Sequence, residues 1–218
     1  LTKTITPNPL TSAASDLKTV TLTWSNASAA SPKLRMYQCV VSDTLPTTAF
    51  DAETVTEGAT PLGYTYSRAG NVVTYTRTDT TTPCETTTQT ATFNVNLKAD
   101  VITGSTYTNT ATATAKTLPS NDPNVSAAVT LTKTTTANVV VSGPVASAKT
   151  AIATSQAFTS DASLDANPPV AIGETVTYSI PFNLQPGVTK AVTLVDEITT
   201  GIGDVTLVAA TLARSSLN

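Results

Sequence analysis

The two cysteines carry the clearest chemistry in this sequence. Cys39 lies in an apolar run and Cys84 follows Thr-Thr-Thr-Pro, and the 218 residues contain no other cysteine. An even count favours a disulfide, and closing a loop of about 45 residues stabilises a fold by roughly 3 to 4 kcal/mol. Two unpaired thiols are the alternative. A metal site at this pair is not expected, because two thiolates without a histidine do not complete a zinc site.

Enzymatic chemistry is not expected. The chain has no histidine, which removes the usual general base near neutral pH and the base of Ser-His and Cys-His pairs. The 15 acids are scattered along the chain. A glycosidase needs two carboxylates facing each other across a groove, and the sequence places no such pair. We expect neither an enzyme nor a cofactor.

One stretch is a weak candidate for calcium. Asp161, Asp165 and Asn167 place three oxygen-bearing side chains within seven residues. Oxygen ligands suit Ca²⁺, but the spacing matches no established calcium loop. A solvated turn is the simpler interpretation.

Composition narrows the class and the location of the protein. The net charge is -3 and only 12% of the residues are charged, so no basic face for nucleic acid is expected. No apolar run approaches the roughly 20 residues that span a bilayer, so direct membrane insertion is not expected either. A chain rich in Thr, Val and Ala favours strands. Together with the cysteine pair, this composition indicates an extracellular or cell-surface β-protein, and a first residue of Leu indicates a processed chain or a piece of a longer one.

The elements that must position these residues are β-strands. Apolar and polar residues alternate with a period of two, as in half-buried strands. The alternating segments are residues 19–24, 71–76, 91–97, 107–113 and 188–195, each bounded by Gly, Pro, Asn or Asp. Such spacing predicts an all-β fold of the sandwich type.

Three elements recur in the same order: a Lys-Thr strand, an alternating strand and an apolar run that ends in Asp. They occupy residues 1–4, 19–24 and 39–43 in the first copy and residues 147–150, 175–180 and 194–196 in the second. An offset of about 150 residues indicates tandem domains. We expect a complete domain over residues 1–143 and a second, incomplete domain over residues 144–218.

An incomplete sandwich leaves an apolar face and unpaired strand edges in water. We expect the missing strands of the second domain to come from further chain or from a neighbouring subunit by strand donation. The expected partners are therefore copies of this chain or other cell-surface proteins.

Four short motifs are shared with a known family. They are Gly-Glu-Thr-Val-Thr-Tyr at 173–178, Asp-Thr-Leu-Pro at 43–46, Asn-Val-Val-Thr-Tyr at 71–75 and Gly-Ser-Thr-Tyr-Thr-Asn-Thr-Ala-Thr-Ala at 104–113. With these motifs the chain resembles, over essentially its whole length, the conserved immunoglobulin-like repeat domain of large prokaryotic surface proteins. That family includes adhesins, surface-layer proteins and fimbria-like proteins. The resemblance implies structural or adhesive work without enzymatic activity, and it implies no particular ligand. The second copy departs from the pattern where Glu-Ile-Thr follows Asp196.

The fimbrial resemblance also implies a covalent cross-link. Some fimbrial sandwich domains join a first-strand Lys to a last-strand Asn by an isopeptide bond, assisted by a buried carboxylate. Lys3, Asn109 and Asp43 fit these roles. Such a triad must lie in the core, since burying Lys and Asp is costly unless they pair. Against it, the chain-end position of Lys3 favours exposure to solvent, and comparison with Asp196 makes Asp43 the end of a core strand, where it closes a turn.

We therefore expect tandem immunoglobulin-like domains that form a subunit or stalk of a cell-surface filament, layer or adhesin. The alternative is an adhesive module that binds a host protein or a carbohydrate through loops such as residues 61–70. That alternative requires an exposed aromatic or polar patch on those loops.

Overall fold

The regular structure of the chain is β. The computed structural model describes residues 1–9, 17–26, 35–155, 173–185 and 187–196, and no helix in these ranges is long and apolar enough to cross a membrane. One 3-10 turn covers Val125–Ala127. The strands are β1 (Thr2–Thr6), β2 (Leu17–Trp24), β3 (Tyr37–Thr44), β4 (Phe50–Glu57), β5 (Tyr64–Ala69), β6 (Val72–Arg77), β7 (Gln89–Leu97), β8 (Thr106–Lys116), β9 (Thr130–Val140), β10 (Val145–Ala146), β11 (Thr150–Thr154), β12 (Val176–Ser179) and β13 (Phe182–Asn183). The predicted all-β class is confirmed.

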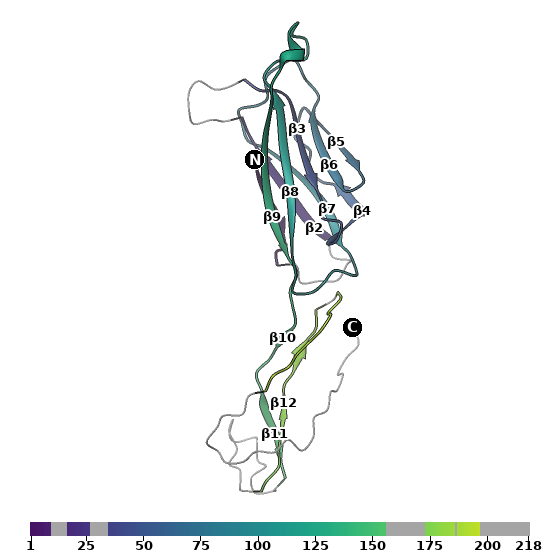
Figure 1. Cartoon of the computed structure of the whole chain (residues 1–218), viewed down its shortest axis with the longest axis vertical. Helices are drawn as coiled ribbons and strands as arrows, with labels where there is room; N and C mark the ends of the chain where they lie inside the picture. Colours follow the sequence, from purple (N-terminus) through teal and green to yellow (C-terminus); the bar gives the residue numbers. More distant parts are fainter. Residues whose placement is uncertain (10–16, 27–34, 156–172, 186, 197–218) are drawn as a thin grey trace.

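Strands β1 to β9 form a sandwich of two antiparallel sheets (Figure 1). One sheet has the order β1-β2-β7-β4 and the other the order β5-β6-β3-β8-β9. The first order is that of the A-B-E-D sheet of an immunoglobulin domain, and β3, β8 and β9 correspond to its C, F and G strands. The immunoglobulin-like architecture predicted for the first part of the chain is therefore present.

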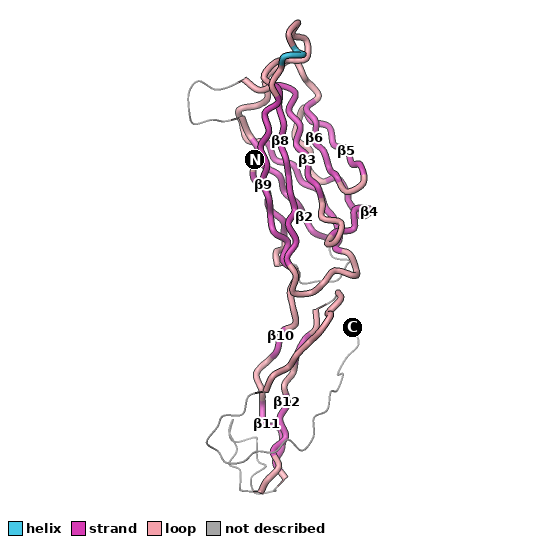
Figure 2. Tube along the Cα trace, viewed as in Figure 1, coloured by secondary structure: helices cyan, strands magenta, loops and turns pink. Residues whose placement is uncertain are grey.

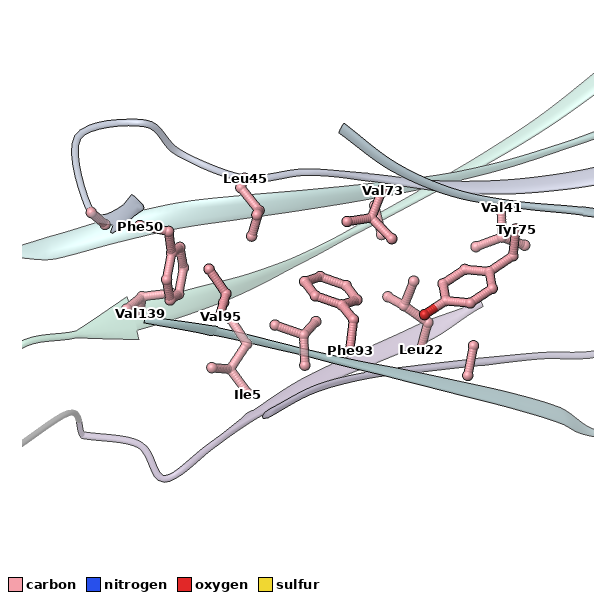
Figure 3. Close-up of a cluster of buried hydrophobic side chains, with 14 of the residues drawn as sticks. Ile5, Leu22, Val41, Leu45, Phe50, Val73, Tyr75, Phe93, Val95 and Val139 are labelled. Carbon is pink, nitrogen blue, oxygen red and sulfur yellow. The ribbon is translucent and has the colours of Figure 1, made fainter. Parts of the chain in front are cut away.

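The core lies between the two sheets. Along β2 the burial alternates, so that Val20, Leu22 and Trp24 face inward while the threonines between them are only partly buried. Figure 3 shows apolar side chains from the two sheets meeting in this space. The ring of Tyr75 is fully buried among them, and its hydroxyl donates a hydrogen bond to the backbone oxygen of Thr92 at 2.8 Å. The period-two pattern thus placed the core correctly.

The alternating segments predicted at residues 19–24, 71–76, 91–97 and 107–113 correspond to β2, β6, β7 and β8. Within the sandwich, strands β4, β5 and β9 were not predicted. β5 occupies most of the stretch that was predicted as a binding loop at residues 61–70. β9 has the sequence Thr-Leu-Thr-Lys-Thr-Thr-Thr-Ala-Asn-Val-Val, and most of its side chains are exposed. It lies at the edge of its sheet and therefore needs few apolar residues, so its sequence shows no clear alternation.

Beyond the sandwich the chain forms two small antiparallel pairs, β10 with β13 and β11 with β12 (Figure 2). The strand predicted at residues 188–195 is wrong: the structure gives this segment one isolated bridge, between Ile102 and Val188. The Val188 amide donates to the backbone oxygen of Val101 at 2.9 Å, and the Thr103 amide donates to the backbone oxygen of Val188 at 3.2 Å. Alternation alone does not make a strand, because a strand also needs a neighbour to pair with.

Candidate functional site

Three strands bring Lys3, Asp43 and Asn109 to one place in the core. Asp43 on β3 is paired in register with Ala111 on β8. Asn109 precedes Ala111 by two residues, so its side chain lies on the same face of that sheet. Lys3 belongs to β1 in the opposite sheet. The three residues, which the resemblance had grouped, therefore meet across the sandwich. Asn109 lies on β8, the strand before the last of the sandwich, and not on the last strand.

The three side chains are buried. Lys3 is 8% exposed, and Asp43 and Asn109 are each 0% exposed. The expectation that Lys3 is solvated was wrong, because Lys3 shares the inward face of β1 with Ile5. The expectation that Asp43 closes a turn was wrong as well. Asp43 is the penultimate residue of β3, and its side chain points into the core.

The only close charge contact within the group is between Lys3 and Asp43. The Lys3 Nζ lies 2.5 Å from Asp43 Oδ2, and both side chains have no solvent exposure. Among the described residues, none of the polar side-chain atoms of the three residues has a well-angled hydrogen bond to another group. Burying unpaired polar atoms is costly. Each member of the triad therefore depends on the other two to offset the cost of its burial.

The core drives the triad toward its neutral forms. Burial lowers the pKa of Lys3 and raises the pKa of Asp43. The attraction between the two groups opposes both shifts, and the neighbouring Asn109 side chain also lowers the pKa of Asp43, but removal from water is the largest effect in each case. Both shifts are in the direction of a neutral amine beside a protonated carboxyl group.

This state has the chemistry needed for amide exchange. A neutral Lys3 amine is a nucleophile, and the Cγ of the Asn109 amide is an electrophile. Attack by Nζ forms an Nζ–Cγ bond and breaks the Cγ–Nδ2 bond of Asn109, and the amide nitrogen leaves as ammonia with its own two protons and one proton lost by the lysine amine. The Asp43 carboxyl can donate a proton to the amide oxygen and accept one from the attacking amine, so it begins and ends the exchange in the same form. The reaction requires neither an oxidant nor a metal ion.

The burial of the triad could have been found in the sequence. Lys3 alternates with Ile5, Asp43 alternates with Val41 and Leu45, and Asn109 alternates with Ala111. Each polar residue thus occupies the apolar face of its own strand, and the alternation rule alone predicts that it points inward. For Lys3, the alternation is a stronger signal of burial than its position near the chain end is of exposure.

The predicted disulfide is present in the structure. Cys39 on β3 is bonded to Cys84 in the connection between β6 and β7, with Cα atoms 6.3 Å apart. Both cysteines pack with Ala115 in a small cluster separate from the main core. The bond ties this connection to the central strand of the larger sheet.

Replacing both cysteines, as Cys39→Ser with Cys84→Ser, is expected to lower the free energy of unfolding by roughly 3 to 4 kcal/mol, because the unfolded chain regains the freedom of a 45-residue loop. Urea denaturation followed by circular dichroism measures the change. Reduction of the wild-type protein serves as the matched control and should give a similar loss. An unchanged midpoint in both experiments would contradict a stabilising role.

The calcium candidate Asp161, Asp165 and Asn167 lies outside the described residues. Within the described ranges, no group of three or more His, Cys, Asp or Glu side chains could hold a metal ion.

Two surface hollows of the sandwich are small. Their volumes are about 240 Å³, beside Gln38 and Lys116, and about 170 Å³, beside Trp24 and the disulfide. Pockets for small ligands usually measure about 300 to 1,000 Å³. The residues 61–70 expected to carry a binding patch expose Leu62 but bury Tyr64. Neither feature favours the adhesive alternative over the structural one.

The chain was compared with known proteins. No family model and no curated protein matches it. Among solved structures, it is similar to the major pilin subunit BcpA of Bacillus cereus, with 15% identity and a TM-score of 0.44 over 86% of this chain and 56% of that one. It is also similar to the pilus 2b backbone protein of group B streptococcus, with 19% identity and a TM-score of 0.43 over 86% of this chain and 80% of that one.

A third similar structure contains domains D2 and D3 of the major pilin SpaD of Corynebacterium diphtheriae, with 20% identity and a TM-score of 0.37 over 62% of this chain and 50% of that one. The chain thus spans about half the length of the first and third of these structures. With TM-scores below 0.5, the function of this chain has to be argued from its own residues.

Proposed function

We propose that this chain is a non-enzymatic structural subunit of an extracellular, cell-surface filament, layer or stalk. Its mechanical element is an isopeptide bond between Lys3 and Asn109 in a domain over residues 1–143. A second immunoglobulin-like domain occupies residues 144–218. The partners are copies of the chain or other cell-surface proteins. No catalytic turnover is involved, since the bond forms once within each molecule.

The observation that supports the proposal is the burial of an amine, a carboxyl group and an amide that have no other partner among the described residues. A buried ion pair alone gives weak net stability, because removing both charges from water offsets their attraction. A core that merely needed to be stable would be served as well by apolar side chains. Formation of the amide bond removes the Lys3 charge. It also explains why three polar groups are buried together, which packing alone does not explain.

The position of the bond suits a protein under tension. Lys3 lies near the start of the sandwich, on an edge strand of one sheet, and Asn109 lies on β8 in the other sheet. A bond between them would join the two sheets covalently. Force applied at the two ends of the sandwich would then pass through the bond and bypass strands β2 to β7. Only the part of β8 after Asn109, β9 and the chain beyond β9 would remain free to extend.

The test is an intact-mass measurement on the denatured, reduced protein. The wild-type chain is expected to be lighter than its sequence mass by one ammonia molecule, and a tryptic map should contain one branched peptide that joins Lys3 to Asn109. Lys3→Arg and Asn109→Ala should each restore the sequence mass.

Two exposed residues provide matched controls. Lys133 and Asn138 both lie on β9 and face solvent, so Lys133→Arg and Asn138→Ala should keep the mass deficit. A wild-type chain at its full sequence mass, with Lys3 and Asn109 recovered in separate linear peptides, would refute the cross-link.

A further inference from the structure

Beyond the sandwich, the chain returns at Val188 to the loop between β7 and β8. The Val188 amide donates to the backbone oxygen of Val101 at 2.9 Å, and the Thr103 amide donates to the backbone oxygen of Val188 at 3.2 Å. The two bonds lie on either side of Ile102, with which Val188 forms a parallel bridge. Val188 is therefore held in the way that a residue of an added parallel strand would be.

The contact continues on both sides of Val188. The hydroxyls of Thr103 and Thr189 lie 2.9 Å apart, within hydrogen-bond distance. The residue before Val188 is Gly187, whose φ of 120° is a conformation that favours glycine. A Cβ atom at Gly187 would lie 2.7 Å from the backbone oxygen of Val101 and 3.2 Å from the methyl carbon of Thr103. The close approach of the two segments thus depends on a residue without a side chain.

The loop that receives Val188 is fixed by contacts of its own. Val101 is buried, at 2% exposure, and its amide donates to the backbone oxygen of Lys98 at 3.3 Å. The Ile102 amide donates to the hydroxyl of Tyr107 at 3.1 Å. The loop therefore presents its backbone groups to Val188 in a defined position.

The same loop holds the chain where it leaves the sandwich. The Val141 amide donates to the backbone oxygen of Ser105 at 2.9 Å, and the Gly104 amide donates to the backbone oxygen of Val141 at 3.0 Å. Val141 and Val188 are more than 40 positions apart in the sequence, yet both are bonded to this loop, at the end of the sandwich from which the chain continues (Figure 1). One attachment alone would let the following segment swing about the chain near Gly143, and the second attachment restricts that motion.

We propose that residues 101–103 and 187–189 form a latch, which holds the segment after the sandwich in one direction when closed and lets it swing about Gly143 when open. The latch is small and partly exposed, with Val188 at 42% exposure, and small contacts between two parts of a chain open locally. By contrast, β8 and β9 are joined over 11 residue pairs. The latch therefore opens while the sandwich stays folded.

The latch gives the chain two mechanical states. When it is closed, force applied beyond Thr189 enters the sandwich through residues 101–103 and bypasses the chain between Gly143 and Gly187. When it is open, the same force passes through Gly143, and the joint bends freely. This inference adds a joint to the proposed structural role and does not depend on the bond between Lys3 and Asn109, which the mass measurement reports separately.

Amide hydrogen exchange on the full chain, followed residue by residue by NMR, tests the latch. In the wild type, the Thr103 and Val188 amides should be protected and should exchange at similar rates, because one opening exposes both. Gly187→Ala is expected to speed both by about tenfold or more and to leave the β8 amides unchanged. Gly173→Ala is the matched control, since Gly173 also has a positive φ, 84°, but nothing lies within 4 Å of an added Cβ.

The hydroxyl pair provides a second test, which adds no bulk to the contact. Thr103→Val and Thr189→Val should each speed exchange of the Val188 amide, and the double variant should exchange no faster than either single variant, because all three lose the same bond. Thr80→Val removes a hydroxyl that lies 2.6 Å from that of Ser120 elsewhere on the sandwich, and it should have no effect. Additive effects of the two latch substitutions would contradict the pairing.

The direction of the following segment is measured by ¹⁵N relaxation of the β11 and β12 amides. These strands should tumble together with the sandwich in the wild type and in Gly173→Ala, and faster than the sandwich in Gly187→Ala. The inference is overturned if the Thr103 and Val188 amides are unprotected in the wild type, if Gly187→Ala and Gly173→Ala exchange alike, or if β11 and β12 already tumble independently in the wild type.

Discussion

Pulled from its two ends under reducing conditions, the wild-type chain is expected to extend by about 350 to 380 Å less than its Asn109→Ala variant. The bond from Lys3 to Asn109 would hold back a loop of roughly 106 residues, and a fully extended residue spans about 3.3 to 3.6 Å. Single-molecule force spectroscopy measures this difference as the contour length released on unfolding. It is the largest effect that we expect from any single substitution.

The disulfide provides an internal control for the stretching experiment. In oxidised Asn109→Ala, the bond between Cys39 and Cys84 still holds back 45 residues. The contour length released on unfolding should therefore be about 150 to 160 Å shorter than in the reduced variant. The oxidised wild type should not change on reduction, because the disulfide lies inside the loop that the isopeptide bond already holds back. Equal contour lengths for wild type and Asn109→Ala would contradict the cross-link.

The second large effect is expected in stability. Asn109→Ala should lower the free energy of unfolding of the sandwich by about 5 kcal/mol, since the loop-closure model gives about 4.7 kcal/mol for a cross-link across 100 residues. For a domain of this size, the loss corresponds to a fall of roughly 10 to 20 °C in Tm. Differential scanning calorimetry measures it, and Asn138→Ala on the exposed face of β9 is the matched control.

Asp43→Ala should be more harmful than Asn109→Ala. It removes the acid needed for bond formation and also leaves the Lys3 amine buried without its partner, and breaking a buried pair typically costs about 3 to 5 kcal/mol. Lys3→Met with Asp43→Leu removes both charges and should recover part of this loss without restoring the bond. If Asn109→Ala and Asn138→Ala melt at the same temperature, the triad contributes ordinary packing only.

Alternation with a period of two was enough to predict the strands that build the core. It located β2, β6, β7 and β8, because each has one buried face and a sequence that reports it. It failed for β9, which lies at an edge and buries little, and for residues 188–195, whose alternation is not matched by a strand. A pattern of side chains records which face is apolar, but it does not record whether a neighbouring strand is present to supply hydrogen bonds.

The sequence by itself determined the all-β class, the cysteine pair, the repeated Lys and Asp positions and the inward-facing alternation of Lys3, Asp43 and Asn109. The tertiary structure decided whether these residues meet. Lys3 and Asp43 lie in different sheets, and the 2.5 Å contact between them depends on how the sheets pack face to face. That packing, and the removal of water that shifts the pKa of each group, arises from contacts between distant segments that no local pattern encodes.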